Sequence, residues 1–374
     1  MDRRQFLTTA AAATLSRRAG AAPPTAPVAV ARCRSYDSEL TPVMEKLFDQ
    51  LGGLGRLVSG KTVAIKVNLT GGSALRLGHA TAENAHWTHP NVIGITCHLM
   101  AKAGARRMRI LESAWNTADP LEEVMYEANW EPSLILGSAP NVEFENTNYL
   151  GSARKYSHFT VPNGGHLFPA YDLNHSYEDC DVFVSIAKMK EHATAGVTLA
   201  MKNCFGITPC TIYGDGGGID EPTPVPHGGR GAVFHQGRRQ PSKSSPAEKD
   251  PTSPRDDKYR IPRAVADLVA ARPIQLSIVE AVESMAGGEG PWIRGTRRCR
   301  PGLIVAGLNP VTTDAVCMSL MGFDPMAERG TAPFELCDST LKLAEELGVG
   351  TRDLRNIEVI GTAVEQVRFD FRKA

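Results

Sequence analysis

The stretch that decides the fold covers residues 181–209 and reads DVFVSIAKMKEHATAGVTLAMKNCFGITP. Its beginning, residues 182–186, is a short apolar run rich in β-branched side chains, which is typical of a buried strand. Residues 194–205 have the length of a helix and are followed by Gly206 and Pro209, which favour the end of a helix. The sequence therefore predicts a strand, a loop and a helix in succession.

Basic side chains cluster where this strand is expected to end. Lys188, Lys190 and His192 follow it with a period of two, so an extended chain would point all three to one side, and Lys202 follows in the predicted helix. Open α/β sheets bind ligands beyond the carboxyl ends of their strands, and crowded ammonium groups attract anions. We predict that these four residues are catalytic. The alternative is a solvated edge of lysines.

The same residues resemble a known family, domain of unknown function family 362. Its hallmark is a serine, two lysines and a histidine with fixed spacing, then a threonine and a lysine–asparagine–x–x–glycine run, matched here by Ser185, Lys188, Lys190, His192, Thr198, Lys202, Asn203 and Gly206. More distantly, the spacing of ten from His192 to Lys202 is similar to that of the histidine and the cofactor-bearing lysine in nickel-pincer lactate racemases. The double glycine that precedes that lysine is missing here.

Two further segments resemble signatures of the family. Lys66 and Asn68 share one face of a predicted strand, and Glu280 lies in a later predicted strand, residues 274–282, that precedes a glycine-rich turn containing Glu289. Opposed charges gathered at one site fit proton transfer or a bound cofactor, so we predict a catalytic role for Glu280 and cofactor binding by Lys66, Asn68, Asn203 and Glu289. The resemblance covers residues 61–361. The family usually has an aspartate where this chain has Asn309.

Histidines and cysteines bear on metal binding. His86 and His89, three residues apart, are candidate metal ligands, although histidines on an ordinary loop are the alternative. The eight cysteines form no C-x-x-C pair, so the chain has no iron–sulfur cluster motif and lacks the ferredoxin segment of some relatives. The cofactor, either a metal ion or an organic molecule, is left open.

Residues 55–62, GRLVSGKT, match the P-loop pattern. A P-loop follows a strand and opens a helix, whose amide groups face the phosphates. Here a helix is predicted before the motif and a strand after it. The inverted context predicts that no nucleoside triphosphate binds there.

The amino terminus has the pattern of an export signal. Arg3 and Arg4 precede an apolar segment over residues 6–15, and small residues follow, so residues 1–26 are predicted to be a twin-arginine signal peptide. The translocase of that pathway is then a partner, and the mature protein is periplasmic or extracellular. A disordered tail with a chance arginine pair is the alternative.

Composition narrows the class of protein. The 374 residues are 42% hydrophobic, and 41 basic residues balance 41 acidic ones. This length and apolar content can bury a sizeable core. No basic excess points to nucleic acid, and no apolar run long enough for a stable membrane anchor is present.

The alternation of strands and helices predicts an α/β fold with a largely parallel sheet flanked by helices, either in one body or in two lobes around a cleft. Residues 27–374 form this domain. Residues 213–258 are rich in Gly, Pro, Ser and charge, and are read either as a lid, with His227 and His235 facing inward, or as a disordered insertion.

These features together suggest an exported metal- or cofactor-dependent enzyme, redox or racemase/lyase-like, that acts on an anionic small molecule. Two alternatives stay open. The protein could be a non-catalytic binder of an anion or metal, or a maturation partner of an exported metalloprotein.

Overall fold

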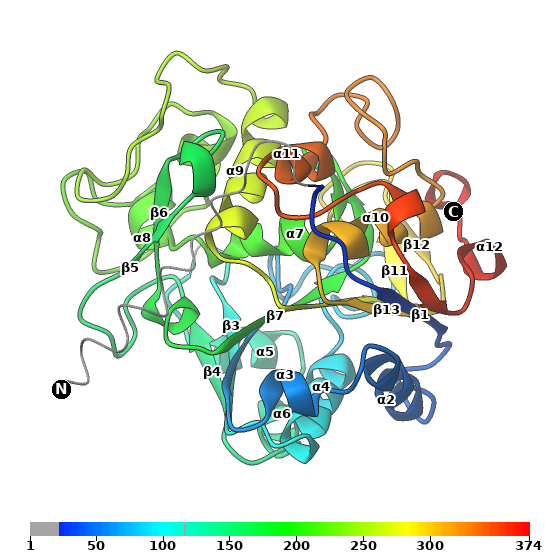
Figure 1. Ribbon diagram of the computed structural model, residues 1–374. Helices are drawn as coiled ribbons and strands as arrows, with labels where there is room; N and C mark the ends of the chain where they lie inside the picture. Colours follow the sequence, from blue (N-terminus) through cyan, green and yellow to red (C-terminus); the bar gives the residue numbers. More distant parts are fainter. Residues whose placement is uncertain (1–21, 116) are drawn as a thin grey trace, which may run out of the picture.

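The computed structural model describes residues 22–115 and 117–374 (Figure 1). The arginine pair and apolar segment of the predicted export signal lie outside these residues. The centre of the fold is one eight-stranded sheet in the order β14-β1-β13-β10-β7-β2-β3-β4. Only β13 runs antiparallel to its neighbours. The strand bounds are β1 Val28–Arg32, β2 Thr62–Lys66, β3 Arg107–Glu112, β4 Val142–Asn146, β7 Val182–Lys188, β10 Leu276–Ala281, β13 Leu303–Gly307 and β14 Val359–Gly361.

Helices cover both faces of this sheet, as Figure 1 shows. One face packs against α2 Leu40–Gln50, α3 Gly55–Val58, α4 Pro90–Lys102, α5 Leu121–Glu127 and α6 Pro132–Leu136. The other packs against α7 Ala200–Asn203, α8 Cys210–Tyr213, α9 Asp257–Ala271, α10 Pro310–Leu320, α11 Thr340–Glu346 and α12 Val364–Val367. The α/β fold with a mostly parallel sheet is therefore confirmed, as a single three-layer body.

The central strand β7 shows why the sequence folds in this way. All seven of its residues are buried, and successive side chains enter opposite cores. Val182, Val184 and Ile186 face the α4 side, whereas Phe183 and Ala187 face the α7 side. A near-continuous apolar run is what a parallel strand covered on both faces requires.

The helix predicted for residues 194–205 is wrong in its first half. The chain instead forms a hairpin of β8 Lys190–His192 and β9 Gly196–Thr198, and helix α7 begins only at Ala200. Gly196 has a φ of +73°, and a Cβ atom there would lie 2.5 Å from the Phe334 ring. This conformation favours glycine and breaks the helix.

The remaining elements are short. Two more ribbons pair β5 Ser157–Thr160 with β6 Ala170–Leu173 and β11 Ser284–Ala286 with β12 Arg297–Cys299. Single helical turns occupy Pro162–Gly164, His175–Tyr177, Cys204–Ile207, Gly231–His235, Leu354–Asn356 and Phe371–Lys373.

Residues 55–62 begin with helix α3 and end at the start of strand β2, so the P-loop-like motif opens with a helix and is followed by a strand.

Residues 213–258 form a long loop, and its helical turn Gly231–His235 contacts α9. Among the described residues, no helix combines the length and the apolar character needed to cross a membrane.

Candidate functional site

Four charged side chains lie at or next to the carboxyl ends of adjacent parallel strands. In sheet order they are Glu280 on β10, Lys188 on β7, Lys66 on β2 and Glu112 on β3. They form two lysine–glutamate pairs. The carboxyl edge of the sheet therefore carries a row of four buried charges, with the two lysines between the two glutamates, and each pair ties one strand to the next.

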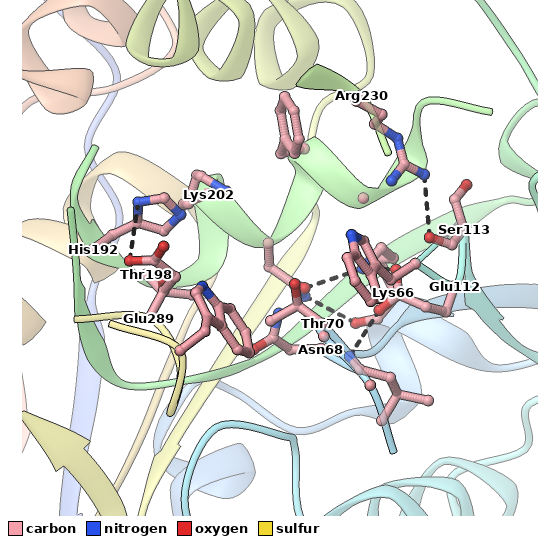
Figure 2. A pocket seen from close by; sticks show the side chains of 18 of the residues that line it. Lys66, Asn68, Thr70, Glu112, Ser113, His192, Thr198, Lys202, Arg230 and Glu289 are labelled. Atoms are coloured by element: carbon pink, nitrogen blue, oxygen red, sulfur yellow. Dashed lines mark hydrogen bonds and ion pairs between the residues drawn. The ribbon is translucent and has the colours of Figure 1, made fainter. Parts of the chain in front are cut away.

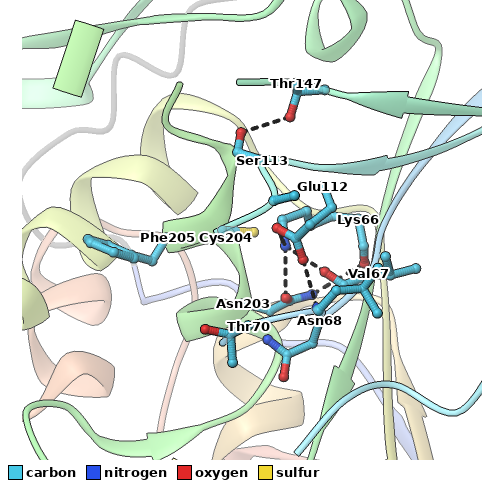
Figure 3. Close-up of polar contacts among 12 residues, drawn as sticks. Lys66, Val67, Asn68, Thr70, Glu112, Ser113, Thr147, Asn203, Cys204 and Phe205 are labelled. Atoms are coloured by element: carbon cyan, nitrogen blue, oxygen red, sulfur yellow. Dashed lines mark hydrogen bonds and ion pairs between the residues drawn. The ribbon is translucent and has the colours of Figure 1, made fainter. Parts of the chain in front are cut away.

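The β2–β3 pair joins Lys66 to Glu112, with 2.7 Å between Nζ and Oε1 (Figure 3). Lys66 also donates to Asn203 Oδ1 at 3.1 Å, and Glu112 accepts a hydrogen bond from Leu69 N at 2.8 Å. Burial lowers the pKa of Lys66, and the adjacent Glu112 carboxylate opposes that effect. Sequence reasoning did not identify Glu112 as a site residue.

Gly206 fits closely against this pair. A Cβ atom at this position would lie 2.7 Å from Glu112 Oε1 and 2.9 Å from Lys66 Nζ. The glycine that ends the family motif thus leaves room for the ion pair.

The β7–β10 pair joins Lys188 to Glu280, both completely buried. Lys188 also donates to the Tyr36 hydroxyl at 3.1 Å and to Glu83 O at 2.7 Å. Glu280 accepts from the Tyr36 hydroxyl at 2.7 Å and from His89 N at 3.1 Å. Strand alternation turns these side chains toward the α4 face of the sheet, so neither lines the cavity described below.

Lys190 is also fully buried, and it donates to the carbonyl of His86 at 2.6 Å. Burial lowers the pKa of Lys190 well below its usual range. Because β7 ends at Lys188 and the hairpin begins at Lys190, the period of two does not continue across the junction. Lys188, Lys190 and His192 consequently have separate surroundings.

A cavity of about 560 Å³ opens on the carboxyl edge (Figure 2). It contains His192 and Lys202 from the predicted catalytic set and Lys66, Asn68, Asn203 and Glu289 from the predicted cofactor set. Its other polar side chains include Glu112, Thr198, Arg230 and His235, and its apolar wall includes Leu69, Leu75, Trp115, Phe205 and Trp292.

Lys202 is the lysine that faces the cavity without a fixed partner. Its Nζ lies 4.5 Å from the centre of the Phe205 ring, and it makes no hydrogen bond or ion pair within residues 22–115 and 117–374. Burial lowers its pKa to about 8, and Glu289 opposes this shift while Lys66 adds to it. A substantial fraction of this side chain is therefore an uncharged amine in mildly alkaline solution.

His192 and Glu289 lie beside Lys202 (Figure 2). His192 Nδ1 accepts a hydrogen bond from Thr194 N at 3.1 Å and lies 3.8 Å from Glu289 Oε2, which itself accepts from Ala193 N at 2.9 Å. Burial, together with the charge of Lys202, lowers the pKa of His192 well below its usual range. The imidazole is neutral, and acceptance at Nδ1 places its proton on Nε2.

Arg230 supplies a further cation from the long surface loop. Its guanidinium donates to Thr208 O at 2.7 Å and to Ser113 O and Asn148 Oδ1 at 3.1 Å each. No carboxylate pairs with it in the described part of the chain. Sequence reasoning missed Arg230, because the lid interpretation of residues 213–258 singled out only His227 and His235.

The loop over residues 213–258 therefore reaches the cavity through Arg230 and His235, whereas His227 lies elsewhere, against Gly216. Burial lowers the pKa of His235, with Lys202 adding to the effect.

Two polar atoms in the cavity wall are buried and have no hydrogen-bond partner among the described residues. They are Asn68 Oδ1 and Thr198 Oγ1. Unpaired buried polar atoms are costly, and a bound molecule is one way to satisfy them.

The two candidate metal ligands have different surroundings. His86 is fully buried edge-on to Trp292, with 5.6 Å between ring centroids, and neither of its ring nitrogens has a hydrogen-bond partner in the described chain. His89 caps α4 by accepting from Asn91 N and stacks on Tyr36 at 3.6 Å. Among residues 22–115 and 117–374, no three His, Cys, Asp or Glu side chains form a group that could hold a metal ion.

The fold and cavity define an α/β protein with a basic pocket at the carboxyl edge of its sheet. The family model described as Domain of unknown function (DUF362) matches residues 63–319, and the chain belongs to that family. This range includes every polar residue of the cavity, as expected from the motif around Lys202.

Among curated proteins, the chain is similar to a thylakoid-associated protein of Synechocystis sp., with 27% identity over 184 residues, which are 49% of this chain and 50% of that protein. Among solved structures it is similar to a Thermotoga maritima protein, with a TM-score of 0.33 and 13% identity, covering 67% of this chain and 52% of the other.

It is also similar to the lactate racemase apoprotein from Thermoanaerobacterium thermosaccharolyticum, with a TM-score of 0.36 and 12% identity, covering 73% of this chain and 54% of that one. The resemblance noted from the spacing of His192 and Lys202 thus reappears among solved structures, at a level too low to support a shared activity. The chain spans about half the length of each of these relatives.

Proposed function

We propose that this protein is an enzyme that binds a small anionic molecule in the cavity and transfers a proton to or from it. The observation that carries the proposal is Lys202, which faces the cavity with no ion pair or hydrogen bond within the described residues. A lysine whose pKa has fallen to about 8 can accept and return a proton near neutral pH.

Arg230 is suited to hold the acidic group of the ligand. Its donors are fixed by three oxygen acceptors, and its charge has no carboxylate partner in the part of the chain described. A guanidinium in this state gains a charge-assisted hydrogen bond when a carboxylate or phosphate arrives, without moving far. The β2–β3 pair lines the same cavity as Arg230, but the charges of Lys66 and Glu112 already neutralise each other.

The chemistry would take place at the end of the cavity near Lys202. The neutral amine would remove a proton from the bound molecule, and the Nε2–H of His192 would donate a hydrogen bond to an oxygen on which negative charge develops. The Glu289 carboxylate, fixed by the amide of Ala193, would stabilise Lys202 once it becomes positively charged.

The basic wall of the cavity also fits an organic cofactor that carries a carboxylate or phosphate group. The side chains fit a metal ion held by protein ligands alone less well, because the described residues contain no suitable group of His, Cys, Asp or Glu. We also propose that the protein is exported by the twin-arginine pathway, on the strength of Arg3, Arg4 and the apolar segment that follows.

The proposal is tested by incubating the protein in D₂O with carboxylic acids that have an acidic C–H bond beside a carbonyl group and following deuterium uptake by NMR. We expect Lys202→Met to abolish exchange and Arg230→Gln to weaken binding. The control is Lys243→Met, since that lysine is exposed and, among the described residues, forms its ion pair with Asp220. Binding without exchange would favour the non-catalytic alternative, and absence of binding to any acid would refute the proposal.

A further inference from the structure

The mouth of the cavity carries large apolar side chains that water can reach. Leu75 is 36% exposed, Trp115 is 50% exposed and Trp292 is 44% exposed, and all three line the cavity. They come from three separate loops, which follow β2, β3 and β11. Exposed apolar groups that gather around a pocket are a sign of a binding surface.

Trp292 is held in place even though half of it faces solvent. A Cβ atom on Gly71 would lie 2.4 Å from Trp292 Cζ3, and one on Gly290 would lie 2.1 Å from Trp292 Cη2. The indole therefore occupies the space that two missing side chains leave, and the edge-on ring of His86 adds a third contact. A rigid and partly open indole is ready to stack on a ligand without a further cost in side-chain entropy.

The size of the cavity also bears on the ligand. Its volume is about 560 Å³, within the range of pockets that enclose drug-sized molecules and far more than an acid of two or three carbons fills. One part of the cavity wall consists of cationic side chains and another part of tryptophans. A ligand can therefore contact both positive charge and flat apolar surface.

We infer that the ligand is an acid that carries a flat aromatic or conjugated group, which stacks on Trp292 and Trp115 while its acidic group binds Arg230. This inference rests on the proposed function and adds the substrate class. The apolar group would displace water from the exposed indoles, and the β2–β3 pair would remain buried beneath the ligand.

The test compares three acids that share the same carboxylate, namely acetate, cyclohexylacetate and phenylacetate, by calorimetric titration and by quenching of tryptophan fluorescence. We expect phenylacetate to bind at least tenfold more tightly than acetate, with cyclohexylacetate between them, since a flat ring stacks better than a puckered one. Trp292→Ala should weaken phenylacetate binding by about tenfold and leave acetate binding unchanged. Arg230→Gln should weaken both.

The control variant is Tyr126→Ala, which removes an aromatic side chain that is 57% exposed and lies outside the cavity lining. It should leave both affinities unchanged, and the melting temperature of each variant verifies folding. Equal affinities for acetate and phenylacetate, or equal losses for both in Trp292→Ala, would overturn the inference while leaving the anion site intact. Failure of every acid to bind would instead refute the proposed function itself.

Discussion

Removing Lys188 tests whether the β7–β10 pair is structural. In Lys188→Met the Glu280 carboxylate stays fully buried and retains only its hydrogen bonds from the Tyr36 hydroxyl and His89 N. Breaking one partner of a buried ion pair costs about 3–5 kcal/mol. At roughly 2–3 °C per kcal/mol for a domain of this size, the melting temperature should fall by about 6–15 °C.

The accompanying control is the double variant Lys188→Met/Glu280→Gln, in which no unpaired charge is left. It should recover about 2 kcal/mol or more of the free energy of unfolding relative to the sum of the two single variants. Burial raises the pKa of Glu280, and without Lys188 this effect is opposed only by the hydrogen bonds from the Tyr36 hydroxyl and His89 N. The folded single variant then binds more protons than the unfolded chain, so its stability falls as the pH rises above the usual carboxyl range.

Calorimetric unfolding of the wild type and the three variants at two pH values measures these effects. If the melting temperature of Lys188→Met falls by less than 2 °C and the effects in the double variant are additive, Lys188 does not have this structural role. Lys188 would then again be a candidate catalytic residue.

Three other predictions concern Gly206, the P-loop-like motif and the amino terminus. Gly206→Ala should cost about 1–3 kcal/mol of unfolding free energy, because the new methyl group overlaps the β2–β3 pair; a melting temperature equal to that of the wild type would refute this. ATP with magnesium should show no binding at residues 55–62 in calorimetry, and heat that disappears in Lys61→Ala would contradict the prediction. Replacing Arg3 and Arg4 by lysine should keep the precursor in the cytoplasm, as fractionation and blotting would show; unchanged export would exclude the twin-arginine route.

The layer structure could be predicted because it depends on local patterns. The buried run in β7 and the strand–helix–strand unit formed by β2, α4 and β3 are visible as apolar periodicity and as a proline that opens a helix. The hairpin after β7 was missed because residues 194–205 contain good helix formers, while the left-handed φ of Gly196 and its contact with Phe334 depend on a distant part of the chain.

The candidate site could be predicted only in part. His192 and Lys202 do line one cavity, but Lys188 and Lys190 do not, because the chain leaves the sheet after Lys188 and each side chain finds a different partner. The pairing of Lys188 with Glu280 is set by strand order, which a single sequence does not reveal. Arg230 comes from residues 213–258, where the lid interpretation named His227 and His235 and only His235 lines the cavity.

The central claim is that Lys202 is a cavity amine with a lowered pKa that responds to a bound acid. It is tested most directly by reductive ¹³C-methylation of the lysines and NMR titration, with the Lys202 signal assigned by its absence in Lys202→Met. We expect a pKa of about 8 for Lys202, against about 10.4 for an ordinary lysine, and a rise in this pKa when phenylacetate binds. A Lys202 signal that titrates with the exposed lysines, and does not move when acids are added, would contradict the account.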